Sequence, residues 1–206
     1  MITPTFQNVD GSEYKLQDIV VVGDNVTGDG DVVIQIMSDQ GEWIGEYDWF
    51  TVDGWGSEKD GWYSAGDEEY ADVTLKSGQA ILVSCDNEDV SFQVSGQVAD
   101  GSRNAVFVGY TMSGNSSPVE IDLQDLIPQG ENITGDGDIV IQVMSAQGEW
   151  IGEFDWFTVD GWGSEKDGWY TAGDEEYADL KLPPGASVLV SCDNEGVEFT
   201  VPSPLK

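Results

Sequence analysis

Apolar residues recur at every second position along much of the chain, and this alternation predicts β-strands. Val32, Ile34 and Ile36 occupy alternate positions, and the segments 81–85 and 90–94 show the same period. Side chains two residues apart lie on one face of a strand, so each segment can bury one face. Segments rich in Gly, Asp and Ser separate the strands, and helical periodicity is hard to find. About six or seven short strands in each half predict an all-β fold with little or no helix.

One long stretch of sequence occurs twice. Residues 40–63 and 147–170 differ at a single position, where Tyr47 corresponds to Phe154. The offset of 107 residues (150 − 43) holds without a gap from about Leu16/Leu123 to Val94/Val201. Two near-copies predict two tandem homologous units of the β-sandwich or barrel-like type, residues 1–105 and 106–206. The junction has no long flexible linker, so we expect the units to pack together about a pseudo-two-fold axis.

The segments LQDIV and LQDLI, which begin at Leu16 and Leu123, occupy equivalent places near the start of each copy. Each is expected to form either a single helical turn or the start of a strand.

The charge of the chain is strongly negative, with 40 acidic residues against 7 basic ones and a net charge of −33. Nucleic-acid binding relies on Lys and Arg to neutralise phosphates, so this composition argues against a nucleic-acid partner. Anionic membranes are disfavoured for the same reason, and no stretch approaches the length of a transmembrane segment. The remaining interpretations are a solvated, aggregation-resistant surface, binding of divalent cations, adaptation to high salt, and mimicry of nucleic acid.

Histidine is absent, which excludes Ser-His-Asp and Cys-His catalysis and imidazole metal sites. Cys85 and Cys192 continue alternating strands at equivalent positions, so we expect buried thiols on the core face, with a disulfide between the copies as the alternative. Acidic residues are so plentiful that no pair stands out as glycosidase carboxylates. We therefore expect no enzyme. The start of the chain shows no signal peptide, so a soluble protein is expected, and a virion or an extracellular compartment remains open.

All eight tryptophans lie inside the repeat. Those on alternating strands are expected in the core, namely Trp43, Trp49, Trp150 and Trp156. Trp55 and Trp162 differ because each lies between two glycines in an acidic turn, where the ring either folds over the sheet edge or is exposed for stacking. An indole can pack on the C–H face of a sugar while acids and amides bind its hydroxyl groups. The candidate ligand-binding residues are therefore Trp55, Trp162, Trp62, Trp169, Asp53 and Asp160.

The Gly-Asp-Gly-Asp turns could hold calcium. Asp29 and Asp31 in the first copy, and Asp136 and Asp138 in the second, place carboxylates two residues apart. Calcium prefers six to eight oxygen ligands, so further ligands would be needed. The alternative is ordinary turn chemistry. The EF-hand spacing is not met, and no other cofactor is expected.

Several motifs span nearly the whole chain: MITPTFQNV at the start, LQDIVVVGDN and LQDLIPQGEN, IQIMSDQG and IQVMSAQG, and the segments before the last strand of each copy. In these motifs the chain resembles a family of mostly uncharacterised, tandem-duplicated all-β proteins of gut bacteria and their phages. The resemblance implies a non-enzymatic component of a virion or surface, and it assigns no functional residue.

Three functional hypotheses follow. The first is a structural or interaction protein that decorates a virion or surface, either as a homo-oligomer or attached to a larger particle. The second is a carbohydrate-binding module, assisted by calcium if the acidic turns hold it. The third is an acidic inhibitor that mimics nucleic acid. The expected partner is a protein or glycan surface.

Overall fold

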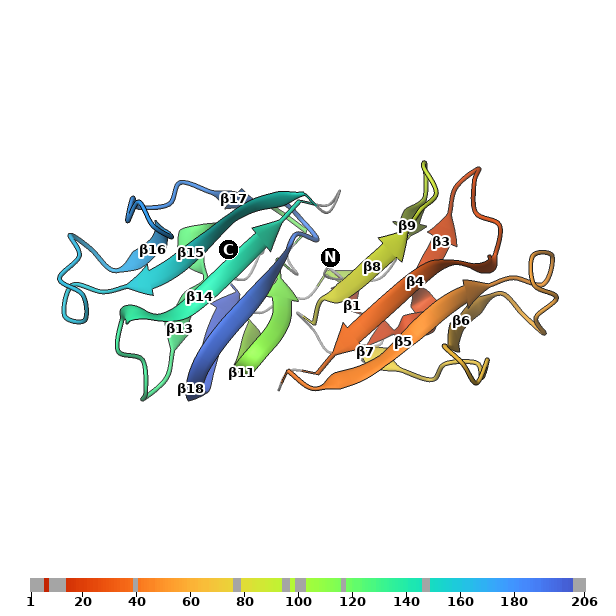
Figure 1. Cartoon of the computed structure of the whole chain (residues 1–206), viewed down its shortest axis with the longest axis horizontal. Helices are drawn as coiled ribbons and strands as arrows, with labels where there is room; N and C mark the ends of the chain where they lie inside the picture. Colours follow the sequence, from red (N-terminus) through yellow and green to blue (C-terminus); the bar gives the residue numbers. More distant parts are fainter. Residues whose placement is uncertain are drawn as a thin grey trace.

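The computed structural model describes residues 6–7, 14–38, 41–75, 79–93, 97–98, 103–115, 118–145 and 149–201. Within these residues the elements are β-strands and two short 3-10 helices, so the protein is all-β, as the alternation predicts. Figure 1 shows two similar halves side by side. No helix in the described part of the chain is long and apolar enough to cross a membrane.

The first unit is built around a four-stranded antiparallel sheet in the order β6-β5-β4-β8. Its strands are β4 (Asp29–Met37), β5 (Trp43–Phe50), β6 (Gly61–Ser64) and β8 (Ile81–Cys85). Shorter strand pairs form a second layer: β2 (Tyr14–Lys15) with β7 (Thr74–Leu75), and β3 (Val20–Val22) with β9 (Ser91–Gln93). The 3-10 helix η1 (Leu16–Asp18) lies between β2 and β3 in the sequence, which selects the helical turn from the two expected alternatives.

The second unit repeats this plan within a larger, six-stranded sheet. Its sheet has the order β11-β18-β14-β15-β16, with β13 also paired to β18. The strands are β11 (Arg103–Gly114), β13 (Ile127–Gln129), β14 (Asp136–Met144), β15 (Trp150–Phe157), β16 (Gly168–Thr171) and β18 (Ser187–Val201). The pair β12 (Ile121–Asp122) and β17 (Lys181–Leu182) and the 3-10 helix η2 (Leu123–Asp125) match β2, β7 and η1. Elsewhere, β1 (Phe6–Gln7) pairs with β10 (Gln97–Val98).

Each unit has its own core between the two layers. In the first unit the alternating Val32, Ile34 and Ile36 of β4 are fully buried, and they share one cluster with Leu16 and Ile19 from the second layer. Burying a large aliphatic side chain contributes roughly 1.5–3 kcal/mol to folding. The alternating apolar side chains lie on one face of the main sheet, and this face packs against the short strand pairs. The result is a two-layer sandwich.

Trp49 and Trp62 form the aromatic centre of the first core. Their rings meet edge to face with centroids 5.3 Å apart, and Trp62 is completely buried. The Trp62 indole N–H donates a hydrogen bond of 2.8 Å to the carbonyl of Ile19, which satisfies its polar atom inside the core. Trp156 and Trp169 repeat the contact at 5.3 Å in the second unit.

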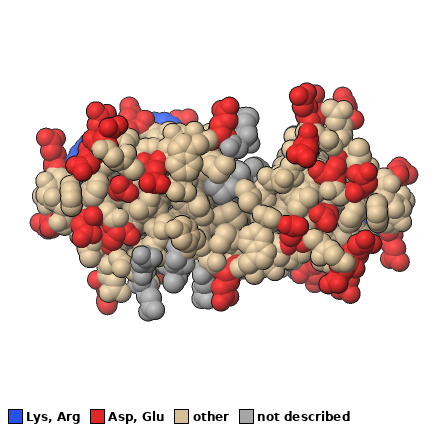
Figure 2. Space-filling view, in the orientation of Figure 1, with Lys and Arg blue, Asp and Glu red and all other residues tan. Residues whose placement is uncertain are grey.

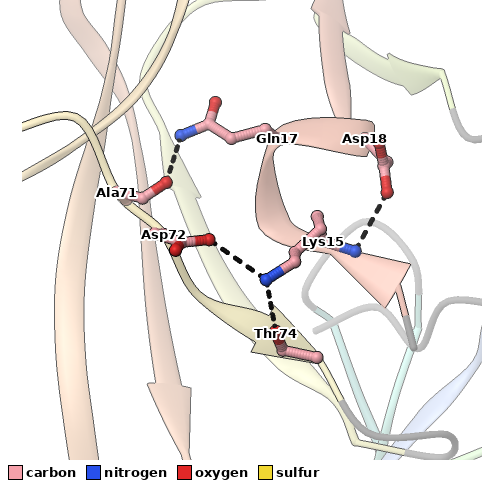
Figure 3. A network of polar contacts seen from close by, with 6 residues as sticks. All are labelled: Lys15, Gln17, Asp18, Ala71, Asp72 and Thr74. Carbon is pink, nitrogen blue, oxygen red and sulfur yellow. Dashed lines mark hydrogen bonds and ion pairs between the residues drawn. The ribbon is translucent and has the colours of Figure 1, made fainter. Parts of the chain in front are cut away.

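The helix η1 is tied to the strand segments beside it (Figure 3). The Gln17 side chain donates to the carbonyls of Trp62 and Ala71, both at 2.8 Å, and accepts from the Trp62 backbone N–H. Lys15 donates to Asp72 at 3.1 Å and to Thr74 at 2.9 Å. The glutamine amide thus hydrogen-bonds to the Trp62 N–H and the Ala71 carbonyl, and it adds a second donor to the Trp62 carbonyl, which also accepts from the Ala71 N–H. These bonds connect β6 to the second layer.

The two halves have opposite orientations in Figure 1, as a pseudo-two-fold relation requires. The loop from β5 to β6 and the loop from β15 to β16 lie at opposite ends of the molecule, while β8 and β18 flank its centre. A third apolar cluster contains three residues of each half: Met37, Ala80 and Leu82 with Met112, Met144 and Leu189. The boundary expected between residues 105 and 106 falls inside β11.

The structure corrects one expectation about the tryptophans. Trp43 and Trp150 were expected in the core, but they are 54% and 56% exposed. The reason is an irregularity in the pairing of β4 with β5, where Ile36 faces Gly45 but Met37 faces Trp43, so that Ile44 is skipped. Such a β-bulge interrupts the alternation of faces, and Trp43 no longer points with Trp49 into the core. The equivalent shift occurs between Val143 and Met144.

Candidate binding pockets at the ends of the two units

Each unit carries a pocket of about 390 Å³ beside the loop that joins one edge strand of its main sheet to the neighbouring strand. In the first unit this is the β5–β6 loop, residues 51–60, and in the second unit the β15–β16 loop, residues 158–167. The lining residues of the two pockets are identical in type and differ in number by the repeat offset. We call them the aromatic pockets, because Phe50, Trp55, Tyr63 and Tyr70 line the first and Phe157, Trp162, Tyr170 and Tyr177 the second.

Trp55 rests on Phe50 at the mouth of the first pocket. The two ring centroids are 5.4 Å apart with planes inclined by 31°, and Trp55 remains 55% exposed. Trp162 repeats this arrangement on Phe157 at 5.4 Å and 28°, also with 55% exposure. The sequence left open whether this ring folds over the sheet or stays exposed. The structure shows both: Phe50 supports the ring, and about half of its surface meets solvent.

Two tyrosines continue the aromatic surface. The Tyr63 ring packs edge to face against two neighbours, and its centroid lies 5.7 Å from that of Phe50 and 5.2 Å from that of Tyr70. The Lys59 ammonium nitrogen lies 3.3 Å from the centroid of the Tyr70 ring, in a cation–π contact. Lys166 lies 3.2 Å from the centroid of Tyr177 in the second pocket.

The β5–β6 loop is held in place by its own hydrogen bonds. The Trp55 N–H donates to the Thr51 carbonyl at 3.1 Å, and the Val52 N–H donates to an Asp60 carboxylate oxygen at 2.8 Å. The Tyr63 hydroxyl donates to the Lys59 carbonyl at 2.9 Å. The second copy makes the same bonds at 3.1, 2.8 and 2.9 Å. The pocket is therefore preorganised, which lowers the entropy lost when a ligand binds.

The structure explains why glycine lies on either side of Trp55. A side chain on Gly54 would collide with the carbonyl oxygens of Thr27 and Gly28, at 2.2 and 2.5 Å from its Cβ. Gly56 has a φ of +79°, a left-handed conformation that costs little only for glycine. The Gly-Trp-Gly motif thus presents the ring on a tight turn against the neighbouring loop.

Carboxylates also line each pocket. Glu58 and Glu68 face the first pocket, and Glu165 and Glu175 the second. Glu68 and Glu175 have φ values of 54° and 53°, in a region that residues other than glycine, asparagine and aspartate seldom adopt. Both copies therefore place glutamate at a turn position that glycine would fill at lower cost.

Two carboxyl groups on the strands leading to these loops have displaced pKa values. Burial raises the pKa of Asp48 on β5, and Glu46 adds to the effect. Burial also raises the pKa of Asp155 on β15, with Glu153 and Glu175 adding to the effect. Glu175, which lines the second pocket, is the smallest of the three causes.

The structure separates the residues that the sequence grouped into one site. Trp55 and Trp162 line the pockets. Asp53 and Asp160 lie exposed on the same loops but outside the lining. Trp62 and Trp169 must be removed from the candidate site, because both are fully buried and donate their indole N–H groups to carbonyls in the core.

The predicted binding site lacked most of the side chains that line each pocket, which in the first copy are Phe50, Glu58, Lys59, Tyr63, Glu68 and Tyr70. Aromatic residues on both sides of the acidic loop were the available signal. The strand pairing that brings Phe50 opposite Gly61, and the bridge between Tyr63 and Tyr70, could not be read from local pattern.

The carboxylates proposed for calcium are engaged in the turn itself. One Asp31 oxygen accepts from the Thr27 N–H at 2.9 Å and from the Asn87 side chain at 2.7 Å, and the other accepts from the Gly28 N–H at 3.2 Å. Asp29 accepts from the Thr27 hydroxyl. Asp136 and Asp138 make the same contacts in the second copy. Among the residues that the structure describes, no group of three or more Asp, Glu, Cys or His side chains is arranged to hold a metal ion.

Cys85 and Cys192 carry thiols, so no disulfide joins the copies. Cys192 is buried as expected, whereas Cys85 is partly exposed. Each Sγ lies 3.6 Å from a backbone carbonyl two residues later in the chain, that of Asn87 and Asn194 respectively.

Comparison with known proteins identifies no relative: no family model matches the chain, and neither a curated protein nor a solved structure matches it. The resemblance described from the motifs stays a prediction, and the function has to be inferred from the pockets.

Proposed function

We propose that this protein is a non-enzymatic binding protein that holds carbohydrate in its two aromatic pockets. The observation that carries the proposal is the half-exposed indole of Trp55, supported by Phe50 in a preorganised pocket and repeated by Trp162 on Phe157. Two copies of one pocket favour a bivalent binder.

The chemistry of the pocket suits a sugar ring. The open side of Trp55 offers an apolar face for the C–H groups of a pyranose, while Glu58 and Glu68 supply acceptors for hydroxyl protons and Lys59 supplies a donor. A volume of about 390 Å³ lies within the range of small-molecule sites. Stacking and hydrogen bonding together give orientation as well as affinity.

The loop is rigid enough for this role without ligand. Its hydrogen bonds fix Trp55 and Lys59 through the backbone, so binding would not require the aromatic surface to be assembled. Weak single-site binding by preorganised pockets is strengthened when two sites engage a multivalent surface.

A glycan array tests the proposal. The wild-type protein is compared with the Trp55→Ala/Trp162→Ala double variant and with a matched Trp43→Ala/Trp150→Ala control, which removes two equally exposed tryptophans outside the pockets. We expect glycan binding by the wild type and the control, and its loss in the pocket variant. Binding that depends on Trp43 and Trp150 instead, or no binding to any glycan, would overturn the proposal.

A second candidate, the structural role in a virion or surface assembly, is favoured by a different feature. Acidic side chains gather at the two ends of the molecule, and the centre of the visible face carries few of them (Figure 2). The hairpin ends that approach this centre expose Trp43, Ile44, Trp150 and Ile151. The strands β5 and β15, which begin at Trp43 and Trp150, run in opposite directions in Figure 1, so each half offers one such patch. An isologous dimer pairs one patch with the same patch of a second copy.

Sedimentation in moderate salt, which screens the repulsion between two acidic chains, tests the second candidate. A monomer–dimer equilibrium that disappears in the Trp43→Ser/Trp150→Ser variant supports assembly through this face. A protein that stays monomeric at high concentration and high salt rules out self-assembly through it.

A further inference from the structure

The aromatic pockets already hold an ammonium group of the protein itself. Lys59 Nζ lies 3.3 Å from the centre of the Tyr70 ring, and Lys166 Nζ lies 3.2 Å from that of Tyr177. No ion pair joins either lysine to a carboxylate among the described residues, whereas Lys15 and Lys181 form such pairs. The Tyr70 and Tyr177 rings of the two pockets therefore each present an aromatic face that an ammonium group occupies.

The charges around that surface favour further positive charge. Each pocket is lined by two carboxylates and one ammonium, Glu58 and Glu68 with Lys59 in the first. Glu68 and its counterpart Glu175 occupy left-handed turn positions, where glycine would be less strained. The pocket thus has a net negative charge beside exposed π-faces, and both features attract cations.

The charge of the whole molecule acts in the same direction. The chain has a net charge of −33, and acidic side chains gather at its two ends, where the β5–β6 and β15–β16 loops lie (Figure 2). At low ionic strength this field concentrates cations near the pockets and repels anions. Sugars that carry carboxylate or sulfate groups would meet repulsion from Glu58, Glu68 and the surrounding surface.

We propose that the aromatic pockets select carbohydrate with a protonated amino group, such as glucosamine units, over neutral and anionic sugars. This inference rests on the proposed function and specifies its ligand class. The sugar ring stacks on Trp55, and its ammonium group pairs with Glu58 or Glu68. A neutral N-acetylated sugar keeps the stacking contact but loses the ion pair, and a uronic acid places like charges together.

The test compares three short probes by calorimetry at low ionic strength: glucosamine oligosaccharides, their N-acetylated counterparts and galacturonic acid oligosaccharides. A Trp162→Ala background leaves one pocket, in which Glu58→Gln/Glu68→Gln removes the carboxylates without removing the aromatic rings. The Trp55→Ala/Trp162→Ala variant keeps the charge of the protein and reports non-specific attraction, as does a lysine trimer used as a probe without a sugar.

We expect the glucosamine probe to bind at least about tenfold more tightly than the N-acetylated probe, and the anionic probe to bind least. The glutamine variant should lose this preference and keep binding to the N-acetylated probe. Equal affinities for the amino and N-acetylated probes, or a preference that persists in the glutamine or the tryptophan variant, would overturn the inference and leave carbohydrate binding intact. No Trp55-dependent binding of any sugar, here or on the array, would overturn the proposed function itself.

Discussion

Trp55 and Phe50 keep their rings 5.4 Å apart at 31°, and Trp162 and Phe157 repeat this geometry almost unchanged. The phenylalanine is the buried last residue of β5, and the tryptophan belongs to the exposed loop that follows. The contact therefore supports a surface ring from the core. It explains how a large apolar side chain can remain half-exposed on a fixed loop.

The tryptophans of the pocket and of the core should respond differently to truncation. Trp62→Ala empties a fully buried site and removes the donor to the Ile19 carbonyl, so we expect a loss of about 3–5 kcal/mol in the free energy of unfolding. Trp55→Ala removes a half-exposed ring and its contact with Phe50, with an expected loss of about 1 kcal/mol. Urea unfolding of the two variants measures both values. Similar losses would contradict the assignment of Trp62 to the core and Trp55 to the pocket.

Gln17 should contribute to stability through the backbone groups it satisfies. In Gln17→Leu the Trp62 N–H and the carbonyls of Trp62 and Ala71 lose their side-chain partner, and we expect a destabilisation of about 2 kcal/mol. Gln35→Leu is the matched control, because that glutamine donates instead to the exposed carboxylate of Glu46. Thermal unfolding should show a clearly lower midpoint for the first variant only. Equal midpoints would show that the η1 contacts are not needed.

Asp31 should act as a structural residue of its turn. Asp31→Ala removes the acceptor for Thr27, Gly28 and Asn87. We expect the free energy of unfolding to fall by about 1–2 kcal/mol, and the midpoint of thermal unfolding to fall with it. Calcium should shift the midpoint of the wild type no more than magnesium does, because the carboxylate oxygens are already engaged. A calcium-specific rise that disappears in Asp31→Ala would restore the metal-site hypothesis.

The partly buried carboxyl groups of Asp48 and Asp155 should make stability fall as the pH rises. Burial raises the pKa of Asp48 above its value in the unfolded chain, so the folded protein binds more protons between the two values. The free-energy cost of keeping the charged Asp48 carboxylate partly buried is absent below its pKa in the unfolded chain. This cost is complete above its pKa in the folded protein. Asp48→Asn should therefore raise the midpoint of thermal unfolding by about one or two degrees at neutral pH and leave it unchanged in acid.

The exposed Asp53→Asn serves as the control for this pH dependence, since it also removes one negative charge. A gain in Asp53→Asn as large as that in Asp48→Asn would assign the effect to net charge instead of burial.

The sequence was sufficient for the fold class, and it singled out Trp55 without deciding whether the ring is covered or exposed. Alternation in β4 placed Val32, Ile34 and Ile36 correctly in the core. The repeat accounts for β14, β15 and β16, but β18 is one continuous strand where the first unit has β8 and β9. Alternation failed for Trp43, because a one-residue bulge at Ile44 changes which face a side chain occupies. Such a bulge leaves no mark in hydrophobic periodicity.

The pocket was only partly predictable for a related reason. Trp55 was singled out by its flanking glycines, whereas Tyr70 reaches the pocket through an isolated bridge to Tyr63 of β6. The burial of Trp62 depends on the second layer. The carbonyl of Ile19 accepts its indole N–H, and Phe92 stacks on its ring with centroids 6.2 Å apart. Neither contact is encoded near Trp62 in the sequence.

The most direct test of carbohydrate binding follows the indole N–H signals of the eight tryptophans by NMR during titration with the best glycan from the array. The signals of Trp55 and Trp162 are assigned through Trp55→Phe and Trp162→Phe. We predict that these two signals shift together and saturably, while those of Trp43, Trp150 and the buried tryptophans stay in place. Unchanged Trp55 and Trp162 signals at saturating glycan, or shifts confined to Trp43 and Trp150, would contradict the assignment of the aromatic pockets as the binding sites.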